Sequence, residues 1–519
     1  AMGAPRPLAR VYTYDSGLDV STAASAQASM PEDDFNAPYA RKAAILAGLG
    51  LVDGAPPPAS TPRVHAELVR VTCDAERAEC TLTPDESAGV VTLALDIVPD
   101  GGLDLALGAH ESGLVRYLET AWDRWARLPP SARCRFFRRP MPPSPSPTSS
   151  SSSVPALVPS NFCARHERAS REPGSGVHAQ TCFYHTDDET PVFKALLPSL
   201  VADVAVVNRV RVELQRDLSF ILGGGGGGGG GGPASRLRPP RRAYHYALVT
   251  HPGHHAGGSS VGGYCYLNNA AILARSLLSA SDDHPDDDPH VASSLATISR
   301  VAILDVDYHF GNGTASIFWD DPDVFFASVH ADTEGDYPWC GGRASDAGGG
   351  RGQGKTLCEP LPRGATWDAE YKPALARALA AIARHDPSVL VVSLGLDAHE
   401  ADPVQERATA GMALTLAEYR EMGRMIGECA AGKGSKNGEG TVGGGGGCSA
   451  TTPVAFVQEG GYDAEHAGAI VAETFRGFEE GFAADEWERG DDAEVIAREV
   501  FAKVVIARGG RSGGGGAGG

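Results

Sequence analysis

From Tyr244 onward, short apolar segments alternate with segments of helical periodicity, and this alternation constrains the fold more than any other feature. The segments that we expect to be strands span 246–249, 301–306, 324–329, 389–396 and 454–458. The segments that we expect to be helices span 268–278, 369–384, 416–430 and 465–482. Strands that are apolar along their whole length and alternate with helices predict a mostly parallel sheet with helices on both faces. In such a sheet the ligand site lies beyond the carboxyl ends of the strands.

The sequence before Tyr244 is less regular, and two helices are expected there, at 112–127 and 192–214. Low-complexity inserts are expected at 140–160, 223–240, 282–294 and 432–450. Runs of glycine hold much of the excess among the 65 glycines, so the composition indicates local inserts rather than a fibrous protein. We therefore predict one large α/β domain over residues 10–508, followed by a disordered glycine-rich tail at 509–519.

Charge and cysteine content narrow the function classes. The chain has 45 Lys and Arg against 65 Asp and Glu, a formal net charge of −20. This balance argues against direct binding to nucleic acid, which needs a concentrated basic surface. The sequence has no apolar run long enough to span a membrane. Ten cysteines without a C-x-x-C pair suggest reduced thiols, so we expect an intracellular protein in the cytoplasm, the nucleus or both. Organellar targeting and the oligomeric state stay open.

Polar side chains follow two of the predicted strands. Asp305, Asp307 and His309 alternate along extended chain and therefore share one face. Asp397 follows the strand at 389–396. Two carboxylates, one imidazole and an open position for water are the arrangement expected of catalytic zinc. For Asp397 alone, the cap of a helix N-terminus is an equally good interpretation.

Two further clusters follow predicted strands. His254 and His255 are adjacent imidazoles, which are suited to general acid and general base catalysis near neutral pH. Tyr462 follows two glycines, and its phenol is suited to stabilising an oxyanion near the metal. Each signal is weak by itself, but all of them fall at predicted strand ends.

Taken in order, these motifs resemble the histone deacetylase family. The matching segments are 254–255, 263–270, 305–314, 328–330, 395–397 and 459–462. The forms at 307–309, 312–314 and 325–328 resemble the class II and bacterial acetylpolyamine-amidohydrolase-like branch. The resemblance is firm over 244–482 and looser over 10–214.

The resemblance implies a three-layer arginase/deacetylase-like fold and a zinc-dependent amidohydrolase. It implies that Asp307, His309 and Asp397 bind zinc, and that His254 and His255 form the acid/base pair with Tyr462 as oxyanion stabiliser. It also implies that Asp305 orients His254 and that Asn312 contacts the second histidine. The implied substrate tube is formed by Gly263, Tyr264 and Tyr337. A structural potassium ion is implied at Asp305, Asp307, His309 and Ser328.

Some positions depart from the family pattern. Residues 250–252, Thr-His-Pro, stand where class II members carry Arg-Pro-Pro, so we expect the inner cavity to lack that arginine. Phe310 stands where a second histidine is common, and we expect it to pack. Val404 lies about where one polyamine-selective branch carries glutamate, which disfavours polyamine selectivity. The rim carboxylate that grips the substrate is not located; its candidates are Asp187, Asp188 and Asp332.

Our leading hypothesis is a zinc deacetylase that acts on N-acetyl-lysine in histones or other proteins and releases acetate and free amine. The alternative within the same chemistry is deacetylation of small acetylated amines such as acetylpolyamines. From other classes, an inactive deacetylase-fold binding module and a two-manganese ureohydrolase of arginase type stay open. The ureohydrolase needs more carboxylates at the strand ends than Asp305, Asp307 and Asp397 provide.

Overall fold

One parallel sheet forms the centre of the protein. The computed structural model describes residues 8–14, 38–49, 66–71, 103–127, 156–159, 189–192, 196–222, 243–279, 298–407, 412–432 and 452–487. Eight strands follow the order β2-β1-β5-β10-β9-β6-β7-β8, and every neighbouring pair is parallel. The strands are β1 (Leu8–Tyr14), β2 (Ala66–Val71), β5 (Ala243–Ala247), β6 (Val301–Asp305), β7 (Val324–Ala331), β8 (Thr356–Leu361), β9 (Val389–Leu394) and β10 (Val454–Gln458). The predicted parallel α/β sheet is confirmed.

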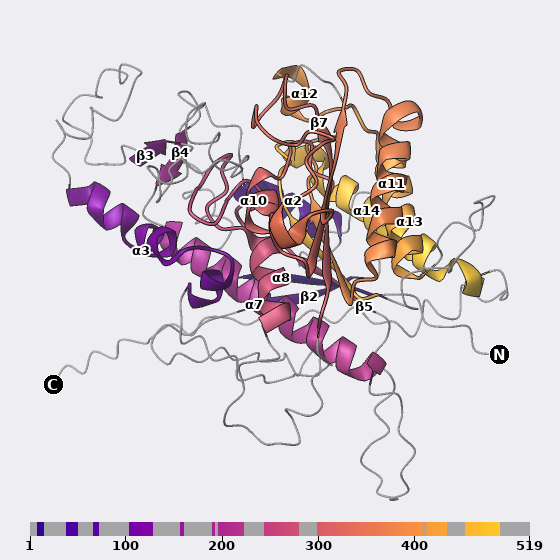
Figure 1. Cartoon of the computed structure of the whole chain (residues 1–519), viewed down its shortest axis with the longest axis horizontal. Coiled ribbons are helices and arrows are strands. Elements are labelled where there is room, and N and C mark those ends of the chain that lie inside the picture. The colour runs from indigo at the N-terminus through magenta and orange to yellow at the C-terminus, as the bar shows by residue number, and fades with distance from the viewer. Residues whose placement is uncertain are drawn as a thin grey trace, which may run out of the picture.

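Helices cover both faces of this sheet (Figure 1). On one face lie α2 (Pro38–Gly48), α11 (Lys372–His385), α13 (Leu416–Ala430) and α14 (Ala464–Trp487). On the other lie α3 (Ser112–Arg127), α7 (Leu196–Leu222), α8 (Asn269–Ser279) and α10 (Asn312–Ile317). The remaining described turns of helix are the 3-10 segments η2 (Asp104–Gly108) and η4 (Gly350–Gly352), the π segment η5 (Trp367–Tyr371) and α12 (Pro403–Arg407). The molecule thus has three layers, with a hydrophobic core on each side of the sheet.

Strand β6 shows why the strands are apolar throughout. Ala302 and Leu304 pack into the core on one face, and Val301 and Ile303 pack into the core on the other. All four side chains are fully buried. Burying a large aliphatic side chain contributes about 1.5–3 kcal/mol, so both faces of the strand stabilise the layers that cover them.

Helix boundaries follow local capping. The Thr415 side chain accepts the Glu418 N–H while Glu418 accepts the Thr415 N–H, a capping box that starts α13 at the predicted residue. Helix α11 ends where Asp386 adopts a left-handed conformation, with φ 53° and ψ 63°. The predicted helix at 369–384 is divided, because its first turn is the π segment η5.

The structure differs from the sequence-based expectations mainly before Tyr244. Strands β1 and β2 and helix α2 were not expected. The helix predicted at 192–214 is α7, which starts at Leu196 because Val192 ends the short strand β4 (Glu189–Val192). Strand β3 (Ala156–Pro159) pairs antiparallel with β4, so part of the insert expected at 140–160 is ordered as a strand. The inserts at 223–240, 282–294 and 432–450 and the tail at 509–519 lie outside the described residues.

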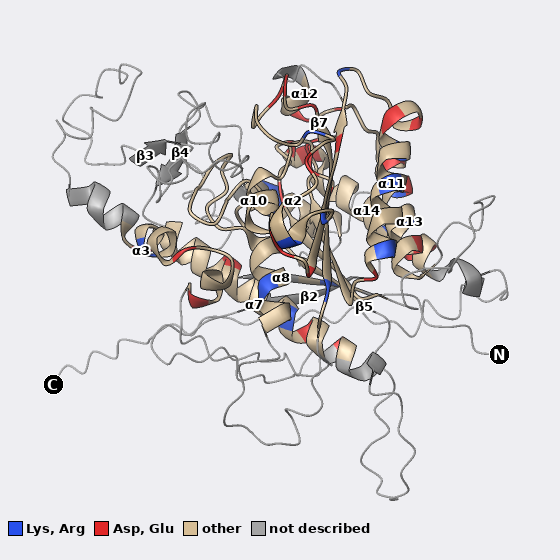
Figure 2. Ribbon diagram, viewed as in Figure 1, with Lys and Arg blue, Asp and Glu red and all other residues tan. Residues whose placement is uncertain are grey.

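Figure 2 shows both positively and negatively charged residues on the helices that cover the sheet. Arg424 of α13 contacts Glu421 and Glu428 on its own helix, and Arg420 contacts Glu480 of α14. Among the described helices, none is both long enough and apolar enough to cross a membrane.

We predict that Phe456→Ala destabilises the protein by about 3–5 kcal/mol, because it leaves a cavity where β5, β10 and α14 meet. The Phe456 ring lies 6.0 Å from Tyr244, 5.1 Å from Phe475 and 5.4 Å from Phe478. Urea denaturation measures the change. Leu107→Ala is the control, since that side chain is 44% exposed and its loss should cost less than about 0.5 kcal/mol. Equal effects of the two substitutions would contradict this description of the core.

Candidate active site

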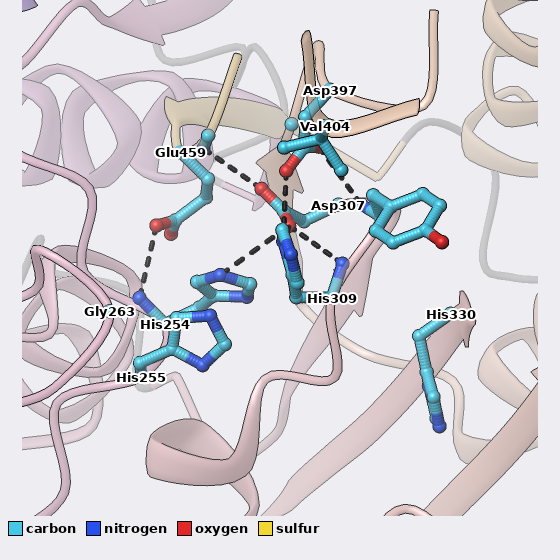
Figure 3. A network of polar contacts seen from close by, with 12 residues as sticks. His254, His255, Gly263, Asp307, His309, His330, Asp397, Val404 and Glu459 are labelled. Atoms are coloured by element: carbon cyan, nitrogen blue, oxygen red, sulfur yellow. Dashed lines mark hydrogen bonds and ion pairs between the residues drawn. The ribbon is translucent and has the colours of Figure 1, made fainter. Parts of the chain in front are cut away.

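The carboxyl ends of β6 and β9 bring two carboxylates and an imidazole together. Asp307 and His309 follow β6, and Asp397 follows β9, the neighbouring strand. One ligand atom from each residue lies within 4.8 Å of the other two. His309 Nδ1 lies 3.0 Å from Asp397 Oδ2 and 3.3 Å from Asp307 Oδ1. In Figure 3 the carboxylate of Asp307 lies between His309 and Asp397. The structure therefore places these three residues in one group.

This group fits a bound metal ion. Asp307 and Asp397 are fully buried, so two like charges share a site away from water. Although burial opposes the charged imidazole, hydrogen bonds to Asp307 and Asp397 raise the pKa of His309 to about 10. A proton on His309 thus compensates the carboxylates where a metal cation would otherwise do so. The absence of a side chain at Gly460 keeps the site open, since a Cβ atom there would lie 2.7 Å from Oδ2 of both Asp307 and Asp397.

His254 is held between two carboxylates. Its Nδ1–H donates to Asp305 Oδ2 over 3.0 Å, and its Nε2 lies 3.5 Å from Asp307 Oδ1. Burial alone would lower the pKa of His254, but the charges of Asp307 and Asp305 raise it well above the usual value. This imidazole therefore carries a proton at neutral pH in the metal-free protein.

His255 has the opposite character. Its Nδ1–H donates to Asn312 Oδ1 over 2.7 Å, which leaves the lone pair on Nε2. Burial, together with the charges of His254 and His309, holds the pKa of His255 well below the usual value. The two rings lie 4.0 Å apart, so one cationic and one neutral imidazole stand side by side.

Tyr462 lies in the turn between β10 and α14. The N–H groups of Tyr462 and Asp463 donate to Asp402 Oδ2 over 2.7 and 3.1 Å, which fixes this turn. Burial raises the pKa of the Tyr462 phenol well above its usual value, and the charge of Asp397 acts in the same direction. Its ring packs edge-on against Tyr264, with centroids 6.1 Å apart. Tyr462 therefore keeps its hydroxyl proton and can donate it in a hydrogen bond.

Of the three residues predicted for the substrate tube, Gly263 and Tyr337 lie against His255, and Tyr264 packs against Tyr462. Gly263 and Tyr264 both have positive φ, 53° and 62°. A Cβ atom on Gly263 would lie 2.4 Å from the His255 ring and 3.0 Å from the Tyr337 ring, so only glycine fits there. Tyr337 packs edge-on against His255 at 4.6 Å and against His309 at 5.9 Å.

Ser328 has its hydroxyl lone pairs available for a cation. His330 Nε2–H donates to the Gly342 carbonyl over 3.0 Å, so its Nδ1, 2.8 Å from Ser328 Oγ, accepts the hydroxyl proton. Ser328 is also the register partner of Asp305 across β6 and β7. Two of the residues expected to hold potassium, Asp305 and Ser328, therefore lie side by side on adjacent strands.

Two buried carboxylates, to which the sequence assigned no role, hold the loop that carries the histidine pair. Asp203 of α7 accepts the N–H groups of residues 250 and 251 over 2.6 and 3.0 Å. Glu459 accepts the N–H groups of residues 253 and 254 over 2.6 and 3.0 Å (Figure 3). Burial raises the pKa of Asp203 to about 6 and that of Glu459 to about 7. The available sequence signal for Asp203 is an isolated acid in an otherwise apolar helical segment.

Arg41 of α2 brings a guanidinium to the loop of Thr250, although the arginine of the class II pattern is absent from positions 250–252. Arg41 is 2% exposed and donates to the carbonyl oxygens of Gly461 over 2.7 Å and of Thr250 over 3.4 Å. Residue 250 is itself a threonine, as noted above. The guanidinium comes from a distant helix that the sequence pattern did not predict.

The other departures have clear positions. Phe310 is fully buried, which confirms that it packs. Val404 is also buried and belongs to the core beneath the site. Asp332 accepts a backbone N–H within its own turn. Asp187 and Asp188 lie outside the described residues.

Fold and site together define a parallel α/β protein with a carboxylate–histidine group at the carboxyl edge of its sheet, and this group fits a metal ion. A family model described as "Histone deacetylase domain" matches residues 165–478. The chain belongs to the histone deacetylase family, and the family implies a metal cofactor.

Several characterised relatives are similar to this chain. Acetylpolyamine amidohydrolase 2 of Pseudomonas aeruginosa is 36% identical over 42% of this chain and 51% of its own length. Acetylpolyamine amidohydrolase of Mycoplana ramosa is 28% identical over 77% of this chain and 90% of its own. Histone deacetylase 10, chloroplastic, of Oryza sativa subsp. japonica is 35% identical over 47% and 45%. The chain thus spans about half the length of the first and third of these relatives.

The fold is similar to a crystal structure of an acetylpolyamine aminohydrolase from Burkholderia pseudomallei, with a TM-score of 0.53. The two chains are 22% identical, and the match covers 87% of this chain and 92% of the other. At this identity the similarity supports the arginase/deacetylase-like fold alone.

We predict that Gly460→Ala lowers the affinity for a divalent metal at least about tenfold, because the added Cβ displaces Asp307 and Asp397. Equilibrium dialysis followed by metal analysis measures the bound ion. Gly258→Ala is the matched control, since the nearest atom to its added Cβ would be 3.8 Å away. Unchanged metal affinity in Gly460→Ala would contradict the assignment of this group as the metal site.

Proposed function

We propose that this protein is a zinc-dependent deacetylase of small acetylated amines such as acetylpolyamines, releasing acetate and the free amine. The observation that carries the proposal is the grouping of Asp307, His309 and Asp397 beside a neutral imidazole, His255, with a proton acceptor on Nε2. Three relatives named acetylpolyamine amidohydrolase favour the small substrate. This choice reverses the order of our sequence-based hypotheses.

Zinc is the proposed ion, held by Asp307, His309 and Asp397. Their two carboxylate oxygens and one imidazole would leave a fourth position for water, and a metal ion held there would supply Lewis-acid activation of the acetamide carbonyl and of that water. A structural potassium ion is proposed at Asp305, Asp307, His309 and Ser328. The hydroxyl geometry of Ser328 supports it, because that oxygen donates its proton to His330 and keeps its lone pairs.

The chain's own residues move the protons. His255 accepts the proton of the attacking water at Nε2, since Asn312 fixes its Nδ1–H and its low pKa keeps it neutral. His254 is held in place by the hydrogen bond that its Nδ1–H donates to Asp305. The imidazolium formed on His255 then protonates the leaving amine, so the same group serves as base and as acid.

Tyr462 stabilises the charge that develops on the acetamide oxygen. Its raised pKa keeps the phenol protonated, and its O–H is a donor preorganised by the Asp402 anchor of its turn. Gly263, Tyr264 and Tyr337 form the proposed tube that admits the acylated amine, with Tyr337 packed on His255.

Deacetylation of acetyl-lysine in proteins is the second candidate. Histone deacetylase 10, chloroplastic, of rice is as similar in identity as the bacterial amidohydrolases. Val404, where a polyamine-selective branch carries glutamate, favours it as well, because a buried valine provides no anion for a polyamine. The acetate-release assay below tests the inactive binding module, and analysis of the bound metal tests the manganese ureohydrolase.

We predict that Tyr462→Phe lowers kcat about 10²- to 10³-fold with a smaller effect on KM, because it removes a donor used in the transition state. Steady-state kinetics on an acetylated amine measure both constants. Tyr371→Phe is the matched control, since that hydroxyl contacts the sulfur of Met422 outside the site. An active wild type with an equally active Tyr462→Phe variant would remove the oxyanion role.

We also predict a higher kcat/KM for an acetylpolyamine than for an acetyl-lysine peptide, by at least about tenfold, which corresponds to 1.4 kcal/mol in the transition state. Acetate release measured with both substrates under the same conditions makes the comparison. A preference for the peptide would favour the second candidate. No release from either substrate, with zinc bound, would favour a binding module.

A further inference from the structure

A second group of metal-ligand side chains lies beside the turn that carries Tyr462. His399 follows β9, and Asp463 and His466 begin α14. One ligand atom from each of the three lies within 4.8 Å of the other two, and the group shares no residue with Asp307, His309 and Asp397. We propose that His399, Asp463 and His466 form a second binding site for a divalent ion of the zinc class.

The three side chains already face one another. The rings of His399 and His466 stack with centroids 5.3 Å apart and an angle of 29° between their planes. His466 Nδ1 lies 2.5 Å from Asp463 Oδ2. The other oxygen, Asp463 Oδ1, accepts the Glu465 N–H over 3.0 Å and so anchors the carboxylate at the start of α14. Oδ2 is therefore the oxygen presented to His466.

A metal ion would replace the proton shared by Asp463 and His466. Two ligands about 2.1 Å from a tetrahedral zinc ion stand about 3.4 Å apart. The observed separations, from 2.5 Å to at most 4.8 Å, bracket that value, and binding requires the stacked imidazole rings to turn their in-plane lone pairs toward one ion. Two imidazoles and one carboxylate are a donor set that binds zinc with a fourth position left for water.

Burial distinguishes this group from an ordinary surface ion pair. An exposed Asp–His pair three residues apart on a helix is common and contributes little. Here the third member, His399, is only 3% exposed, and it is placed from another part of the chain. Its Nδ1 accepts the Ala401 N–H over 3.3 Å, a long hydrogen bond that a metal ion can displace at small cost. The His466 side chain is 40% exposed, so an ion can enter from solvent.

The position of the site gives it a structural consequence. Asp402 already joins the turn after β9 to the turn of Tyr462 and Asp463 through two backbone hydrogen bonds. An ion held by His399 and Asp463 would join the same two segments a second time. Occupancy therefore stiffens the turn that carries Tyr462 without placing a group against the substrate.

Cobalt binding to the full chain tests this inference. The chain is first stripped of metal with a chelator and then titrated with Co²⁺, and bound metal is counted by elemental analysis. We expect two ions per wild-type chain, one per chain in His466→Ala, and two in Glu465→Gln, which changes an exposed neighbour on the same turn. One ion in the wild type, or two in His466→Ala, would overturn the second site.

A thiolate variant supplies a direct spectroscopic readout. His466→Cys keeps a ligand at the position, so the second Co²⁺ ion should add a near-ultraviolet thiolate-to-cobalt charge-transfer band that the wild type lacks. Its absence from the folded variant would contradict ligation at residue 466. Asp307→Asn identifies the other ion, because it should lose that ion and keep the second. Failure of the second site is thus distinguishable from failure of the proposed zinc deacetylase.

Discussion

Negative charge buried at one edge of the sheet is the constraint on which the site depends. Asp305, Asp307, Asp397 and Glu459 are all fully buried at or near the carboxyl ends of neighbouring strands. Carboxylates in such a place are strongly destabilising unless cations and hydrogen-bond donors compensate them. Two imidazoles, His254 and His309, supply the positive charge in the metal-free chain. A bound metal ion would take over part of this compensation, which is why stability and metal binding are linked here.

Three carboxylates, Glu459 among them, fix the loops around that charge. Asp203 and Glu459 hold the loop of the histidine pair, and Asp402 holds the turn of Tyr462, each by accepting at least two backbone N–H groups. Loops after parallel strands leave their N–H groups without sheet partners, so these bonds satisfy donors that burial would otherwise leave unpaired. The reactive side chains are therefore positioned through their backbone. A rigid backbone is what allows His255 and Tyr462 to act from fixed points.

The sequence predicts the fold and the ligand group well because both depend on local patterns. Strands that are apolar along their whole length, such as β6, predict a sheet that is buried on both faces. Asp307 and His309 lie two residues apart directly after β6, so the sequence alone places them together. Capping by Thr415 fixed the start of α13 at the predicted residue. Arg41 and Asp203 were missed because their partners lie 420 and 47 residues away in the chain. For Asp203 the sequence signal is an isolated acid in an apolar stretch of helix, whereas Arg41 stands beside Lys42 and gives no such signal.

The two metal-ligand groups differ in how much each needs its ion. In the first, Asp307 and Asp397 are fully buried and repel each other, so an empty site is costly and binding is correspondingly favourable. In the second, the single carboxylate of Asp463 caps α14 and its partner His466 is 40% exposed, so water and the neighbouring imidazole satisfy the group without a metal. The first group therefore binds a metal ion more tightly and is filled first. The second group binds more weakly, so its occupancy depends on the free metal concentration.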